Sequence, residues 1–296
     1  MLKRPRSLPR PRTGALLTAT AALLSAGVLG AAAPAGAATA PQAPGPSQVQ
    51  GSAGEKAAAT EKTAGKSRVT AAVLPLDGTG RTPTLRGADV PYDTASIVKV
   101  DILATALLQA QDAHRPLTAR ERALADPMIR HSDNAAANTL WRQIGRAPGL
   151  EAANKRLGLT STKGGPGAKW GLTRTTASDQ IRLLRAVFDI GGTARGGSAA
   201  LTAQSRAYIR ALMTNVAPDQ AWGVSSAGTQ WALKNGWLQR NTSGLWDVNS
   251  VGRISVDGHP CLVAVLSDGN ASMNDGIRLV QGAARAAVSS ATGSGH

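Results

Sequence analysis

The sequence predicts an α+β fold, in which strands from both ends of the chain form one antiparallel sheet and a helical subdomain is inserted between them. Two observations predict this arrangement. Short apolar runs bounded by turn residues occur near 68–75 and again between 231 and 266. Between these runs, from about 96 to 213, apolar residues recur every three or four positions, which is the period of an amphipathic helix.

The first 40 residues have the pattern of a secretory signal peptide. A basic head precedes an uncharged apolar stretch at 15–33, and small residues suited to cleavage follow at 35–40. A membrane anchor is the alternative, but the stretch is rich in Ala and Gly and lacks flanking stop-transfer charges. No cysteine lies near the cleavage site, which argues against a lipid anchor. We therefore expect a secreted protein, extracellular or associated with the cell wall.

Residues 41–66 are mostly Ala, Pro, Gly, Ser, Gln and Lys and show no apolar periodicity. This composition is typical of a disordered linker, because such a segment cannot bury enough apolar surface to fold. The folded domain is therefore expected over residues 67–290.

Within that domain, each element has a local signal. Asp77 and Gly78 form a turn that ends the first strand, and Thr118 is a favoured N-cap for the second helix. The segment 158–173 is rich in glycine and contains a proline, so it is expected to be a loop. The expected elements, in order, are strands at 68–75 and 82–85, helices at 96–114, 118–127, 135–144, 150–157, 176–190 and 201–213, strands at 231–234, 246–254 and 261–266, and a closing helix at 274–288.

The first of these helices carries a lysine in an unusual place. Asp101, Thr105, Gln109 and Asp112 recur on one polar side of the helix. Lys99 points roughly 160° away from Asp101, into the apolar arc of the same helix. Burial lowers the pKa of an amine, which could then take a proton from a neighbour at neutral pH.

Ser96, one turn before Lys99, is a neighbour suited to that chemistry. A serine hydroxyl becomes a good nucleophile when a base removes its proton, and free N–H groups at a helix start favour anionic intermediates. Ser96 and Lys99 are therefore interpreted as nucleophile and base. The alternative is that Ser96 is only an N-cap and that Lys99 extends to water.

Net charge and cysteine content limit the other functions. The whole chain has 33 basic and 18 acidic residues. A basic secreted protein suits an anionic cell wall, although an Arg-rich composition can also follow from a GC-rich genome. A nucleic-acid partner is not expected, because no basic run with interleaved aromatic residues occurs. The single cysteine, Cys261, lies in an apolar run and is expected to be buried.

Two further short patterns follow Ser96 and Lys99 along the chain: Ser132-Asp133-Asn134, expected between helices, and Lys234-Asn235-Gly236, expected on a late strand. Each pattern alone could be a helix cap or a strand end with an Asn-Gly turn. In this order and on these elements, the three patterns resemble those of penicillin-recognising serine hydrolases, and among them the class A β-lactamases. The resemblance covers about residues 67–288.

The resemblance implies a role for each matched residue. Ser96 matches the acylated nucleophile and Lys99 the residue that deprotonates it. Ser132 matches the hydroxyl that relays a proton to the leaving nitrogen, Asn134 the side chain that binds the substrate amide, and Lys234 the cation that attracts the substrate carboxylate. Asn235 and Gly236 complete the substrate-binding strand, and the backbone N–H groups of Ser96 and Trp237 would form the oxyanion hole. Asp133 matches a structural position. His131 is not expected to be a triad base, because Lys99 already supplies one and no carboxylate is placed to orient the histidine.

The chain also departs from the family pattern. Class A enzymes release the acyl group with a loop glutamate, yet no Asp or Glu occurs between Glu151 and Asp179. Asn235 replaces a Thr or Ser, although its amide could still donate to a carboxylate. The stretch between Lys99 and Ser132 is shorter than is usual in the family, so the cleft is expected to be more open.

These features together predict a serine hydrolase that is acylated by a β-lactam or by a related amide, such as a peptidoglycan peptide ending in D-Ala-D-Ala. Release of a β-lactam acyl group is expected to be slow or absent. The alternative is a penicillin-binding or sensor module that does not hydrolyse its ligand. No cofactor or metal is expected, because the four histidines are scattered, and we expect a monomer.

Overall fold

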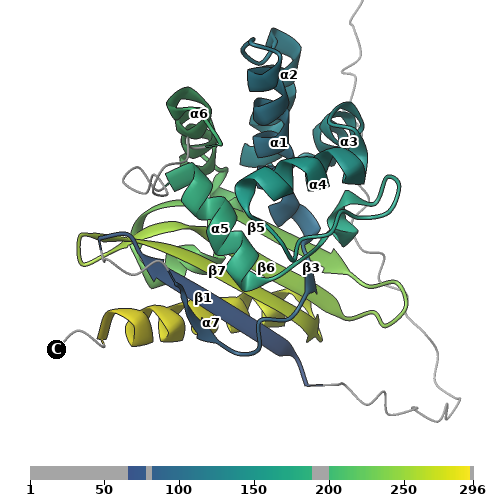
Figure 1. Cartoon of the computed structure of the whole chain (residues 1–296). Coiled ribbons are helices and arrows are strands. Elements are labelled where there is room, and N and C mark those ends of the chain that lie inside the picture. Colours follow the sequence, from purple (N-terminus) through teal and green to yellow (C-terminus); the bar gives the residue numbers. More distant parts are fainter. Residues whose placement is uncertain (1–65, 78–81, 189–199, 294–296) are drawn as a thin grey trace, which may run out of the picture. The chain divides into compact units, whose positions relative to one another are not determined.

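The structure is a computed structural model, and it describes residues 66–77, 82–188 and 200–293 (Figure 1). The predicted signal peptide (1–40) and all but the last residue of the predicted linker (41–66) lie outside the described residues. The last two positions of the helix predicted at 176–190 also lie outside them.

The described chain is an α+β domain, as predicted. Its strands are β1 (Arg68–Pro75), β2 (Thr84–Arg86), β3 (Tyr92–Asp93), β4 (Arg174–Thr175), β5 (Thr229–Gln239), β6 (Trp246–Val256) and β7 (His259–Asn270). Its α-helices are α1 (Val98–Asp112), α2 (Ala119–Arg130), α3 (Asn134–Gln143), α4 (Arg146–Leu157), α5 (Ala177–Phe188), α6 (Ala203–Thr214) and α7 (Met273–Thr292). Short 3-10 helices are η1 (Ala95–Ile97), η2 (Trp170–Leu172), η3 (Pro218–Gln220) and η4 (Gly223–Ala227).

Strands from both ends of the chain share one sheet, which confirms the prediction. The strand order is β2-β1-β7-β6-β5, and each neighbouring pair is antiparallel. Val73 in β1 pairs with Val263 in β7, although most of the folded chain lies between them. A separate two-stranded sheet joins β3 to β4, and β3 leads directly into η1.

The central strands are buried on both faces, because helices cover the sheet on each side (Figure 1). In β7, Val263 and Val265 point into a core shared with α7, whereas Leu262 and Ala264 point into the core of the helical subdomain. This alternation follows the two-residue period of a strand.

Helix α1 runs through the middle of the helical subdomain and packs against α2, α3, α4 and α6. Its polar side therefore does not face water along its whole length: Asp101 and Thr105 are buried, whereas Gln109 and Asp112 near its end are exposed. Sequence periodicity alone could not show this, because it does not count the neighbouring helices.

Two boundaries differ from the prediction. Helix α4 begins at Arg146 instead of residue 150, because Pro148 lies in the first turn, where a missing N–H is tolerated. Strand β5 extends to Gln239, so the Asn-Gly pair lies inside a strand and does not form a turn. None of the helices in the described part of the chain combines the length and apolarity needed to cross a membrane.

Candidate active site

Ser96 lies at the start of the helical subdomain, in η1, and is buried against the edge of the large sheet. Asn249 of β6 holds the preceding backbone, because its amide donates to the carbonyls of Asp93 at 2.9 Å and Thr94 at 3.1 Å. Ala95 has a φ of 45°, a left-handed conformation that costs a non-glycine residue roughly 1–3 kcal/mol and occurs preferentially at functional sites. The backbone before Ser96 is thus both strained and fixed.

Lys99 is fully buried, and its amine is surrounded by polar atoms from two later segments. The Nζ atom lies 2.9 Å from Ser96 Oγ, 3.1 Å from Ser132 Oγ, 2.5 Å from the Ser132 carbonyl oxygen and 2.8 Å from Asn134 Oδ1. The predicted nucleophile, base and proton relay therefore meet around one amine. Ser132 itself has a φ of 58°, so a second left-handed residue lies at this point.

Lys234 reaches the same hydroxyl from β5. Its Nζ donates to Ser132 Oγ at 3.0 Å and to the Asn235 carbonyl oxygen at 2.9 Å, and the side chain is almost completely buried. The hydroxyl of Ser132 thus lies between two lysine amines. This arrangement joins the helical subdomain to the sheet.

The surroundings favour the uncharged form of both amines. Burial lowers the pKa of Lys99 to about 7, although the nearby Asp133 carboxylate opposes the shift. Burial also lowers the pKa of Lys234 well below its usual value, and the positive charge of Lys99 adds to this effect. An amine with a pKa near 7 can act as a proton acceptor at neutral pH.

The Ser132-Asp133-Asn134 pattern connects α2 to α3. Asp133 is the N-cap of α3 and accepts a hydrogen bond from the Ala136 N–H at 2.6 Å, which agrees with a structural position. Asn134 is exposed and lines the cavity beside Ser96, while its Oδ1 accepts from Lys99. Its amide N–H groups are therefore oriented by the lysine. His131, the preceding residue, is exposed.

Gly236 brings β5 against the backbone of Ser96. A Cβ atom added at Gly236 would lie 2.6 Å from Ser96 N and 2.8 Å from Ile97 N, so only glycine allows this approach. The next residue, Trp237, lines the cavity. Ser96 and Trp237 thus both line the cavity.

The Asn235 side chain lies elsewhere than the sequence suggested. It is fully buried, and its amide nitrogen donates to the carbonyls of Gln220 at 2.7 Å and Trp222 at 3.0 Å. Both of its N–H bonds hold η3 and the following turn against β5. This geometry does not leave the amide free to donate to a substrate carboxylate.

A cavity of about 640 Å³ opens beside Ser96. None of its described lining residues is acidic. They are Ala95, Ser96, Asn134, Asn138, Ala168, Lys169, Trp170, Gly171, Leu172, Trp237, Leu238, Gln239, Arg240, Asn241 and Thr242. Among the residues that the structure describes, no group of three or more His, Cys, Asp or Glu side chains could hold a metal ion.

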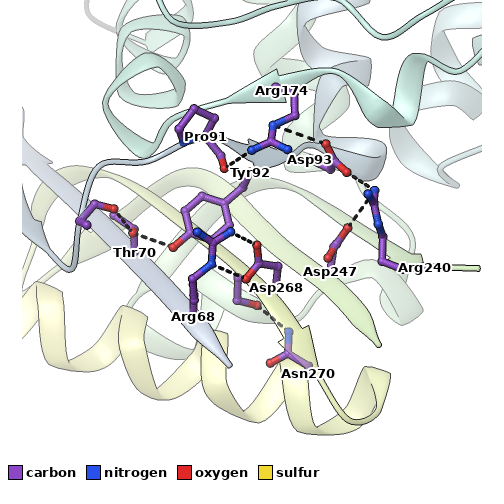
Figure 2. Close-up of polar contacts among 12 residues, drawn as sticks. Arg68, Thr70, Pro91, Tyr92, Asp93, Arg174, Arg240, Asp247, Asp268 and Asn270 are labelled. Carbon is purple, nitrogen blue, oxygen red and sulfur yellow. Dashed lines mark hydrogen bonds and ion pairs between the residues drawn. The ribbon is translucent and has the colours of Figure 1, made fainter. Parts of the chain in front are cut away.

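Arg240, at the end of β5, is a cavity residue that sequence reasoning missed. Figure 2 shows its guanidinium bridging Asp93 and Asp247, with Arg174 on the other side of Asp93. The Arg240 Nη1 to Asp247 Oδ2 distance is 3.7 Å, and that from Arg174 Nε to Asp93 Oδ1 is 3.8 Å. Because Asp93 lies in β3, Arg174 in β4 and Asp247 in β6, and Arg240 directly follows β5, no local sequence signal indicated that they would meet.

Trp170 was also missed. Its ring lies over the amine of Lys99, with 4.8 Å between Nζ and the ring centroid, and its Nε1 donates to Asn138 Oδ1 at 2.7 Å. A bulky aromatic residue in a glycine-rich loop was the one available hint. Its contact with Lys99, far earlier in the chain, could not be read from the sequence.

Comparisons with known proteins identify the family and the fold. A family model described as "Beta-lactamase enzyme family" matches residues 108–291, a range that begins after Ser96 and Lys99. A beta lactamase from Burkholderia vietnamiensis has a TM-score of 0.60 at 22% identity, covering 77% of this chain and 92% of that chain. A class A beta-lactamase from Bacteroides cellulosilyticus also has a TM-score of 0.60, at 15% identity, covering 76% and 92%. These two similarities show the fold.

Two curated relatives, each named "Putative lipoprotein LppW", come from Mycobacterium tuberculosis and Mycobacterium bovis. Each is 28% identical over 153 residues, covering 49% of this chain and 46% of the relative. The match thus spans about half the length of these relatives.

Proposed function

Because the chain belongs to the beta-lactamase enzyme family, we propose that it is a secreted serine hydrolase that forms an acyl-enzyme at Ser96. Its substrate would be a β-lactam or a related amide, such as a wall peptide ending in D-Ala-D-Ala. The observation that carries this proposal is the buried amine of Lys99, 2.9 Å from the Ser96 hydroxyl.

The contacts of Lys99 support its role as a base. The Ser132 carbonyl and Asn134 Oδ1 can only accept hydrogen bonds, whereas the two serine hydroxyls can also donate. A neutral amine has two N–H bonds for the two obligate acceptors and a lone pair for a hydroxyl. The surroundings are thus complete for an uncharged lysine that accepts the proton of Ser96.

Acylation would proceed as follows. Ser96 Oγ bonds to the substrate carbonyl carbon as its proton moves to Lys99, and the oxyanion accepts from the N–H groups of Ser96 and Trp237. The carbon–nitrogen bond then breaks, and a proton passes from Lys99 through Ser132 to the leaving nitrogen. Lys234 contacts Ser132 Oγ, so its amine would assist this transfer. A bound substrate carboxylate would raise the pKa of Lys234 again, and the resulting cation would hold that carboxylate. Asn134 would bind the substrate amide.

We expect the acyl-enzyme with β-lactams to persist. Hydrolysis needs a base to activate water, and none of the described residues around the cavity is a carboxylate. A penicillin-binding or sensor module without hydrolytic turnover is the second candidate function, and the same absence of a carboxylate favours it.

Export is part of the proposal. It rests on the signal-peptide pattern of residues 1–40, and the relatives' printed name, putative lipoprotein, is compatible with it. At the cell surface, the excess of basic residues would favour the anionic wall.

Labelling with a fluorescent penicillin, followed by intact mass over time, tests the proposal. The wild type should gain one penicillin mass, and Ser96→Ala should gain none. Ser225→Ala, outside the cavity, is the matched control and should label like the wild type. The proposal is wrong if the wild type is not labelled by penicillin and cleaves no D-Ala-D-Ala peptide.

The two candidate functions differ in turnover. A chromogenic cephalosporin or a D-Ala-D-Ala peptide that is cleaved many times per enzyme molecule would identify a hydrolase. A single acylation with no further product from either compound would identify the sensor.

A further inference from the structure

The ring of Trp170 packs on Lys99, the proposed base. Its ring lies 4.8 Å from Lys99 Nζ, and the same residue lines the cavity beside Ser96. Lys99 is fully buried, whereas Trp170 is partly exposed. The ring therefore contacts the amine and also the space that a substrate would enter.

The ring is held in this position. Trp170 Nε1 donates to Asn138 Oδ1 at 2.7 Å, which ties the loop to α3. A second indole, that of Trp141, donates to the Gly167 carbonyl at 2.8 Å and ties the same loop three residues earlier. Between these two attachments the loop has little freedom to lift the ring away from Lys99.

This placement matters for the second half of the reaction. Water must approach the acyl carbon next to a base, and Lys99 is the base beside Ser96 Oγ. The amine of Lys99 already contacts Ser96, Ser132 and Asn134, and the ring of Trp170 packs on it as well. A water molecule that Lys99 could activate would need the volume that the ring occupies.

We infer that Trp170 shields the acyl-enzyme from hydrolysis by keeping water away from Lys99. The inference rests on the proposed function and adds to it a reason for slow release that does not depend on a missing carboxylate. Trp170 is thus a positioning residue that acts through Lys99.

Without the ring, water could hydrolyse the acyl-enzyme with Lys99 as the base. The water oxygen bonds to the acyl carbon, one water proton moves to Lys99 Nζ, and the bond from the carbon to Ser96 Oγ breaks. The proton on Lys99 then passes to Ser96 Oγ, which restores the free enzyme. No co-reactant besides water is required.

The experiment measures two rates separately, acylation by a fluorescent penicillin and decay of the adduct after a chase with unlabelled penicillin. Trp170→Ala should raise the decay rate by about 100-fold, the lower end of general-base effects. Trp170→Phe keeps a ring over the amine and should decay like the wild type. Trp141→Phe, the matched control, releases the other loop attachment and should also decay like the wild type.

A pH profile separates shielding from a loosened fold. Decay in Trp170→Ala should rise with pH as Lys99 loses its proton, because only the neutral amine activates water. The charged groups that act on Lys99 are Asp133, which favours its charged form, and Lys234, which opposes it; both remain in every variant.

The outcomes are distinct. Accelerated, pH-dependent decay in Trp170→Ala alone supports the inference. Unchanged decay in Trp170→Ala, while Ser96 still labels, overturns it, and so does equal acceleration in Trp141→Phe. If penicillin does not label the wild type, cleavage of a D-Ala-D-Ala peptide decides. Cleavage by neither the wild type nor Trp170→Ala overturns the proposed function and the inference with it, whereas faster turnover by Trp170→Ala than by the wild type supports the shield and equal turnover overturns it.

Discussion

At the scale of single residues, the hydroxyl of Ser132 is the centre of the site. It lies 3.1 Å from the amine of Lys99 and 3.0 Å from that of Lys234. Two ammonium ions this close would repel each other strongly in a buried place. Burial lowers the pKa values of both lysines, and the charge of Lys99 lowers that of Lys234 further, so the two amines are not both charged at neutral pH.

The first prediction concerns the pH dependence of acylation. The labelling rate at Ser96 should rise as the pH increases through about 7, the pKa of Lys99, because the reactive amine is the uncharged form. Above that pH the rate should level off. Lys99→Arg keeps the charge but cannot lose its proton, so its rate should fall by at least about 100-fold. A flat profile between pH 5 and 9 would show that another group is the base.

The second prediction concerns Asp101, on the same helix. Both of its carboxyl oxygens are buried without a hydrogen-bond partner among the described residues. Burial raises its pKa from 3.8 to about 7; Asp179 adds to the shift and Asn154 opposes it. Because the folded pKa exceeds the unfolded one, the contribution of Asp101 to stability is full below about pH 4 and is lost as the pH rises to about 7.

Asp101→Asn removes this titration. At pH 8 the variant should be more stable than the wild type by up to roughly 4 kcal/mol, since each pKa unit corresponds to about 1.4 kcal/mol. The difference should shrink toward pH 4. Urea unfolding at several pH values measures this difference. If the free energy of unfolding depends on pH in the same way for the wild type and for Asp101→Asn, water reaches the carboxylate and its pKa is not raised by burial.

At the scale of elements, the site depends on how closely β5 approaches η1. That approach is possible because Gly236 has no side chain where it meets the Ser96 backbone. The strand then places the Lys234 amine within hydrogen-bond distance of the Ser132 hydroxyl, and Trp237 lines the same cavity as Ser96.

The third prediction tests this contact with one type of substitution at two places. Gly236→Ala should push β5 from η1, lower stability by about 1–3 kcal/mol through overpacking and abolish labelling of Ser96. Gly282→Ala is the matched control, because no atom lies within 4 Å of the added Cβ in α7. It should stabilise the fold by about 0.5–1 kcal/mol, as expected for alanine in a helix. Thermal unfolding and penicillin labelling report the two effects, and normal labelling of Gly236→Ala would contradict the close approach.

Elements with local signals could be predicted from the sequence. Thr118 and Glu121 form the reciprocal capping box that begins α2. Because the two residues are only three positions apart, the signal for this helix start is local. The strand β5 was predicted too short, because its second half is held by pairing of Gly236 and Trp237 with β6. Such pairing depends on the tertiary fold and leaves little trace in a single segment.

The same distinction applies to the candidate site. Three short patterns were enough to predict that Ser96, Lys99, Ser132 and Lys234 would lie together, and the structure brings them together. The direction of the Asn235 side chain could not be predicted, because it depends on the turn that packs against β5. The chemical roles of Ser96, Lys99, Ser132 and Lys234 remain predictions until acylation is measured.

At the scale of the whole molecule, the chain has 33 basic and 18 acidic residues, and 28 basic and 18 acidic residues would remain after removal of the predicted signal peptide. The fourth prediction is that the protein binds isolated anionic cell wall and that binding weakens as salt increases. At 1 M salt the Debye length falls to about 3 Å, so surface charges are screened. Ser96→Ala should bind like the wild type in a sedimentation assay, because retention does not require acylation. Binding that is unchanged as the salt rises from about 0.01 M to about 1 M, over which the Debye length falls from about 30 Å to about 3 Å, would exclude an electrostatic cause.

The pairing of β1 with β7 also determines when the protein can react. Ser96 and Lys99 are synthesised in the first half of the chain, but Lys234 and the Trp237 N–H arrive on β5, and β7 must follow before the sheet can close. A chain still emerging from the ribosome therefore has its serine but lacks the surroundings that activate it. The proposed acylation of Ser96 would therefore begin only once these last strands are in place.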